Sequence, residues 1–80
     1  MQEMKRLRWQ CRRGVKELDA MLCAYLDNQY AVAGEMEQRL FNELLALEDD
    51  LLIAAFFANG LPEQEGLKQL VEKIRSTFTG

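Results

Sequence analysis

The apolar residues of segment 14–27 recur with the period of an α-helix, and this spacing restricts the fold more than any other feature of the sequence. In a helix that begins near Gly14, one face carries six apolar residues: Val15, Leu18, Met21, Leu22, Tyr25 and Leu26. They follow the i, i+3, i+4, i+7 pattern of a buried helical face. The segment therefore predicts an amphipathic helix that packs into a core.

The rest of the chain also has the pattern of helices rather than strands. Val, Ile and Thr are scarce, and no apolar–polar alternation is visible. Further apolar stripes predict helices over about residues 3–11, 35–47 and 51–58, and a last helix from residue 62. The 80 residues contain one proline and no linker-like stretch. We therefore expect a single domain, 1–80, with an all-α fold: a compact five-helix up-and-down bundle.

Several details of the packing follow from these stripes. Met36 opens the buried stripe of segment 35–47. The apolar segment 51–58 should be buried on all sides under its neighbours, and the alternative is that one exposed side marks a contact surface. Pro62 fits the first position of the last helix. Trp9 either closes the core or is an exposed interface anchor, and we favour its partial burial. Four residues are predicted at the centre of the core: Leu18, Leu22, Leu44 and Val71.

The outward face of segment 14–27 is the candidate binding surface. At about 100° per residue, Arg13 and Glu17 lie nearly opposite the buried face, next to Gly14 and the small residues Ala20 and Ala24. Helix stability does not explain the charged pair, because a cation at a helix start opposes the macrodipole and Arg preceding Glu is the poorer orientation. We predict a protein-docking surface. The alternative is that Gly14 is an N-cap or hinge and the charges are solvated.

Charge and composition exclude several classes of function. Residues 1–16 contain six cations and one acidic residue, whereas residues 17–65 contain eleven acidic residues and Arg39 alone. This asymmetry steers encounter with a protein partner, and a net charge of −3 disfavours nucleic-acid binding. Histidine is absent, which removes His-dependent catalysis and the commonest zinc ligands. We predict no enzymatic activity, no catalytic residue and no metal site.

The sequence also carries expectations about location. No signal peptide is visible, and the longest apolar run, 51–58, is far shorter than the ~20 residues that span a bilayer. Cys11 and Cys23 have no metal or redox spacing, which favours free thiols in a reducing compartment. The acidic triplet 48–50 predicts a helix break with a new N-cap, and a metal site is the weaker alternative. We expect a cytoplasmic protein without membrane insertion.

One extended motif resembles that of the succinate dehydrogenase flavin-assembly factors, the SdhE or YgfY-like family. It reads Trp9-x-x-Arg12-Arg13-Gly14-x-x-Glu17-Leu18-Asp19-x-x-Leu22, and it continues with Tyr30, Glu37-x-x-x-Phe41-x-x-Leu44-Leu45 and Gly60-x-Pro62. The resemblance covers about residues 5–75. The chain departs from the family pattern in its fourth helix, where Ala55 or Phe56 stands in place of a Trp.

The resemblance implies a non-enzymatic assembly factor. Such factors bind the flavoprotein subunit of succinate dehydrogenase, and in bacteria also that of fumarate reductase, and promote covalent attachment of FAD to a histidine of that subunit. Arg13, Gly14 and Glu17 match the functional motif of the family, and Arg12 and Trp9 join them as expected partner-binding residues. We expect a bacterial cytoplasmic monomer that does not itself bind FAD tightly. An antitoxin-type protein or a general helical adaptor for another protein partner remains the alternative.

Overall fold

Five α-helices and one short 3₁₀ turn make up residues 2–78, the part of the chain that the computed structural model describes. The elements are α1 (Gln2–Gln10), α2 (Lys16–Asn28), the turn η1 (Tyr30–Val32), α3 (Glu35–Leu45), α4 (Asp49–Phe57) and α5 (Glu65–Thr77). Residues 2–78 contain no strand. The predicted all-α fold of five helices in one globule is confirmed.

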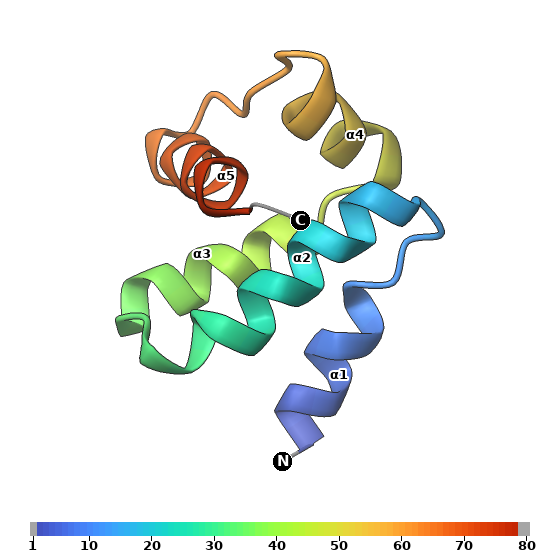
Figure 1. Cartoon of the computed structure of the whole chain (residues 1–80). Coiled ribbons are helices and arrows are strands. Elements are labelled where there is room, and N and C mark those ends of the chain that lie inside the picture. Colours follow the sequence, from blue (N-terminus) through green and yellow to red (C-terminus); the bar gives the residue numbers. More distant parts are fainter. Residues whose placement is uncertain (1, 79–80) are drawn as a thin grey trace.

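Figure 1 shows how the helices are arranged in space. Their buried apolar side chains form one core. Helices α2 and α3 run through its middle, α1 packs against both, and α5 also packs against both. Helix α4 contacts α5. The four residues predicted at the centre, Leu18, Leu22, Leu44 and Val71, are fully buried. Tyr30 of η1 packs back onto the core, with its ring centroid 5.6 Å from that of Phe41.

Two helix starts follow the sequence pattern. Gly34 is the N-cap of α3, and Glu48 is the N-cap of α4 after the predicted break. Acidic residues occupy the first turn of both helices, Glu35 and Glu37 in α3 and Asp49 and Asp50 in α4. Negative charge at these positions is favourable because the N-terminus of a helix carries the positive end of its dipole.

The prediction that Met36 is buried is wrong, because 66% of its surface is exposed. The buried residues of α3 are Phe41, Leu44 and Leu45. At about 100° per residue, Met36 lies roughly 130° from the centre of the arc that these three define. Its side chain therefore points away from the core.

Segment 51–58 is not buried on all sides. Leu52, Ala55 and Phe56 face the core, whereas Leu51 is 53% exposed and Phe57 is 45% exposed. The i, i+3, i+4 spacing of the buried residues shows that α4 packs through one face only. The predicted all-round burial is wrong, since α4 lies at the edge of the globule rather than within it.

Pro62 does not begin the last helix. Asn59 adopts a positive φ of 59°, Gly60 donates a hydrogen bond to the carbonyl of Ala54 at 2.8 Å, and the chain then continues to Gln64, the N-cap of α5. The prediction placed the helix start too early, because the turn at the end of α4 leaves a distance that the chain must cross before α5 begins.

None of the helices in residues 2–78 has both the length and the apolar character needed to cross a bilayer.

Candidate protein-interaction site

The predicted motif lies in the loop that joins α1 to α2. Helix α1 ends at Gln10, and Cys11 follows it into the core, fully buried. Gly14 has a φ of +83°, a backbone conformation that residues with a Cβ rarely adopt. A right-handed helix cannot pass through this conformation, so α2 begins after it, at Lys16, with Val15 as the N-cap.

The carboxylate of Asp19 holds this loop in place. It accepts a hydrogen bond from the backbone N–H of Arg13 at 2.8 Å and another from that of Gly14 at 3.2 Å. Asp19 lies in the first turn of α2, where a negative charge is favourable. One side chain thus fixes the two backbone amides that precede the helix.

The side chain of Arg13 turns toward the body of the protein. Its Nη1 donates to the carbonyl of Leu47 at 3.3 Å and to Oδ1 of Asp49 at 3.1 Å, and its Nη2 donates to the carbonyl of Leu45. The Leu45 carbonyl lies at the C-terminal end of α3, which carries the negative end of the helix dipole, and the Leu47 carbonyl belongs to the loop before α4. The side chain is 16% exposed. Arg13 therefore fastens the α1–α2 loop to the junction of α3 and α4.

The predicted outward pair of Arg13 and Glu17 is wrong for Arg13. The prediction extended the helical wheel of α2 back to residue 13, but the positive φ of Gly14 ends that geometry before Arg13 is reached. The Nε atom of Arg13 is buried, and it has no hydrogen-bond partner within residues 2–78. The side chain lies where it supports the loop, and its guanidinium is turned away from solvent.

Glu17 and Gly14 do lie on the outside, as predicted. Both are exposed, and a Cβ added to Gly14 would meet no atom within 4 Å, so the space above this residue is open. The Glu17 carboxylate forms no ion pair in the described part of the chain. The residue Glu17 lines a hollow of about 330 Å³ together with Val15, Lys16 and Phe57. We call this the Glu17–Phe57 hollow.

Phe57 was not among the predicted site residues, although the sequence offered an exposed side of segment 51–58 as the alternative that would mark a contact surface. The signal was the unbroken apolar run of residues 51–57, which is more apolar surface than the single packed face of a short helix can bury. Asp19 was noted only as part of the motif, and its function in holding the loop was also missed.

Trp9 is exposed over 75% of its surface, so the favoured partial burial is wrong. Leu7 and Cys11 face the core, and Trp9 stands two positions from each of them, about 200° around the helix. With Lys5, Arg8 and Arg12, it lines a second hollow of about 250 Å³. The sequence-predicted site residues are therefore divided: Trp9 and Arg12 share this hollow, whereas Glu17 borders the other.

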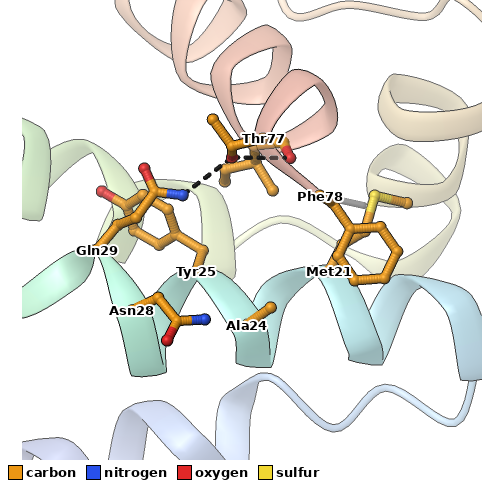
Figure 2. Close-up of a pocket in the computed structure, with 8 residues that line it drawn as sticks. Met21, Ala24, Tyr25, Asn28, Gln29, Thr77 and Phe78 are labelled. Carbon is orange, nitrogen blue, oxygen red and sulfur yellow. Dashed lines mark hydrogen bonds between the residues drawn. The ribbon is translucent and has the colours of Figure 1, made fainter. Parts of the chain in front are cut away.

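A third hollow, of about 330 Å³, lies between α2 and the C-terminal end of α5 (Figure 2). Met21, Tyr25 and Phe78 line it, and Nε2 of Gln29 donates to Oγ1 of Thr77 at 2.9 Å across it. None of the predicted site residues contributes to this hollow.

The titratable groups near the loop offer no reactive centre. Burial raises the pKa of Cys11 to about 12, which keeps the thiol protonated and unreactive at neutral pH. Within residues 2–78 no three His, Cys, Asp or Glu side chains gather as a metal site would require.

Comparison with known proteins assigns the chain to a family. Residues 5–78 match the family model described as flavinator of succinate dehydrogenase. The chain belongs to this family. The flavinator family consists of non-catalytic assembly factors, and the match confirms the resemblance found in the sequence.

The curated relatives within the flavinator family are bacterial proteins called FAD assembly factor SdhE. The protein of Acinetobacter baylyi is 38% identical over 98% of this chain and 92% of its own length. The relative in Coxiella burnetii is 34% identical, covering 89% and 87%, and that of Pseudomonas aeruginosa is 36% identical, covering 90% and 86%. No solved structure gives a significant match.

Proposed function

We propose that this protein binds the flavoprotein subunit of succinate dehydrogenase and promotes covalent attachment of FAD to that subunit. The observation that carries the proposal is the match of residues 5–78 to the flavinator family, which includes the loop and both hollows that flank it. The flavoprotein subunit of fumarate reductase is the second partner that we propose. FAD becomes attached to the partner subunit, and we propose that this protein does not itself bind FAD tightly.

The protein acts by positioning. It contains no histidine, so the histidine that accepts the flavin belongs to the partner. A bound helper that holds the flavin and the acceptor histidine of the partner in a reactive orientation lowers the barrier without donating a chemical group. This fits a chain whose candidate surface consists of a glycine, a carboxylate and exposed apolar side chains.

The loop contributes a rigid surface to this complex. Asp19 fixes two backbone amides, and the side chain of Arg13 fixes the loop to α3 and α4. A surface that is already ordered loses less conformational entropy on binding. We therefore assign Gly14 and Glu17 to contact with the flavoprotein and Arg13 to support of the surface that they form.

Trp9 and Arg12 form a second proposed contact. Trp and Arg are among the residue types most enriched in the energetic centres of protein interfaces, and the Trp9 side chain is exposed rather than packed on the rest of the protein.

We propose that the protein works as a monomer in the bacterial cytoplasm, and that it binds neither nucleic acid nor membrane.

Covalent flavinylation tests the proposal directly. Flavin-free flavoprotein subunit is mixed with FAD and a dicarboxylate, with and without this protein, and the flavin fluorescence of the denatured subunit is followed on a gel over time. Acceleration by the wild type and its loss in Glu17→Ala would support the function and the site. If the flavoprotein is shown to be competent and its flavinylation is not accelerated, the proposal is overturned. That result would favour the alternative, an antitoxin-type protein or a general helical adaptor.

A further inference from the structure

We propose that the Glu17–Phe57 hollow receives one cationic side chain, an Arg or a Lys, of the flavoprotein. This inference rests on the proposed function and names the chemistry of one contact within it. The stem of the incoming side chain would pack on Phe57 and Val15, and its charged end would pair with the carboxylate of Glu17.

The apolar wall of the hollow is the first observation. Phe57 is a large aromatic residue with 45% of its surface uncovered, and Val15 beside it is only partly buried. Helix α4 packs on the core through Leu52, Ala55 and Phe56. Phe57 takes no part in this packing and remains exposed. A side chain with an apolar stem would remove this surface from water.

The charge of the hollow is the second observation. Glu17 has no ion-pair partner among the described residues, and it is one of the residues that line the same hollow as the apolar wall. Arg and Lys are the side chains that combine an apolar stem with a positive end. A hydrogen bond between such a cation and a carboxylate is among the stronger polar contacts of an interface.

Lys16 also lines the hollow, and its charge limits where the cation can lie. Two cations repel each other, so the incoming charged end should lie on the side of Glu17 and Phe57, away from Lys16. The opposite occupant, a carboxylate of the partner that pairs with Lys16, is the alternative that the experiment has to separate.

Both walls of the hollow belong to helices that pack on the core. Glu17 belongs to the first turn of α2, and Phe57 ends α4. Arg13 binds both sides of this arrangement: its backbone N–H is held by Asp19 of α2, and its guanidinium contacts Asp49 at the start of α4. The hollow is therefore formed before the partner arrives. The open space above Gly14 extends the same surface along the loop.

A double-mutant cycle tests whether one partner side chain contacts both walls. The affinity for the flavoprotein subunit is measured by calorimetry for the wild type, Phe57→Ala, Glu17→Gln and the double variant. Each single change should weaken binding by about tenfold. The double variant should lose clearly less than the product of the two, because both changes remove contacts of the same side chain. Leu51→Ala is the matched control on α4, and it should change affinity less than about twofold.

The sign of the charge is tested with Lys16→Gln. Removal of a repelling cation should strengthen binding about twofold. The apolar wall has its own test: Phe57→Leu keeps an apolar side chain, so it should restore most of the affinity lost in Phe57→Ala. Losses that multiply in the double variant, or a Lys16→Gln variant that binds weakly while Glu17→Gln binds normally, would overturn the inference. These outcomes require a wild type that binds; failure of the wild type to bind overturns the proposed function instead.

Discussion

Arg13 and Leu47 are joined by a hydrogen bond from the guanidinium Nη1 to the backbone carbonyl, at 3.3 Å, across 34 positions of the chain. The same Nη1 atom contacts Asp49 at 3.1 Å. An arginine of the recognition motif thus belongs to the scaffold, where it links the loop before α2 to the loop before α4. Its substitution should act on folding before it acts on binding.

Replacement of Arg13 by alanine should lower the free energy of unfolding by about 2–3 kcal/mol, because it removes charge-assisted hydrogen bonds to the end of α3. Urea denaturation followed by circular dichroism measures this loss. Arg13→Lys keeps the charge but not the forked geometry, so it should recover only part of the stability. The control is Arg12→Ala at the exposed neighbouring position, which should change the stability by less than about 0.5 kcal/mol. Equal stability of Arg13→Ala and wild type would contradict the scaffold function.

Two substitutions of Gly14 separate its backbone conformation from its small size. Gly14→Ala adds one carbon into open space but forces a positive φ, which should cost about 1–2 kcal/mol of stability. Asn accepts positive φ more readily than Ala but carries a larger side chain. If the partner approaches closely, Gly14→Asn should be the more stable variant and the weaker binder. Thermal melts and flavoprotein titrations measure the two properties. If Gly14→Asn is both more stable and a tighter binder than Gly14→Ala, only the backbone conformation matters.

Stability should fall in acid through Glu37. Its carboxylate accepts a hydrogen bond from the Tyr25 hydroxyl at 2.5 Å and contacts Lys73 Nζ at 2.9 Å. The Tyr25 hydrogen bond, followed by the smaller effect of Lys73, lowers the pKa of Glu37 in the folded state. The stabilisation is therefore present above the ordinary pKa of about 4.3 and is lost as the pH falls through the lower, folded value.

Denaturation of the wild type and of Glu37→Gln between about pH 7 and pH 3 checks this dependence. The wild type should lose more stability than the variant as the pH falls below about 5, because the variant has no carboxylate to protonate. Glu43→Gln, at an exposed position of the same helix, should keep the pH profile of the wild type. Identical profiles for the wild type and Glu37→Gln would refute the prediction.

Leu44→Ala should cost about 2–5 kcal/mol, because it opens a cavity at a fully buried position between α3 and its neighbours. A small domain has a total free energy of unfolding of about 5–15 kcal/mol. The variant should therefore melt at a clearly lower temperature than the wild type. The exposed position Leu51 supplies the comparison, since Leu51→Ala leaves no cavity. A melt of Leu44→Ala that matches the wild type would mean that the core is assigned incorrectly.

The helices and the centre of the core were predictable because amphipathic spacing depends only on local geometry. Leu18, Leu22, Leu44 and Val71 lie where the stripes place them. The errors arose where the chain leaves helical geometry or where a neighbour decides the outcome. A wheel drawn through Gly14 placed Arg13 outside, although the positive φ of that glycine turns the arginine toward α3.

Exposure of aromatic residues was the second source of error. Hydrophobicity favours burial of Trp9 and of the whole segment 51–58, yet only the faces that meet another helix are covered. Whether a partner helix lies opposite a given face depends on the tertiary arrangement, which no local pattern contains. The exposed Trp9 and Phe57 are consequently the residues for which the structure changed the interpretation most.

The α1–α2 loop is fixed by hydrogen bonds to residues that come more than 30 positions later in the chain, and this has a consequence during synthesis of the protein. Arg13 finds its partners only when residues 45–49 have been synthesised and folded, because its side chain contacts these residues. A growing chain, or a synthetic peptide that contains the motif but stops before α3, will present Glu17 next to an α1–α2 loop that is not fixed in place. Such a fragment should fail to compete with the complete protein for the flavoprotein, so recognition is delayed until more than half of the chain is in place.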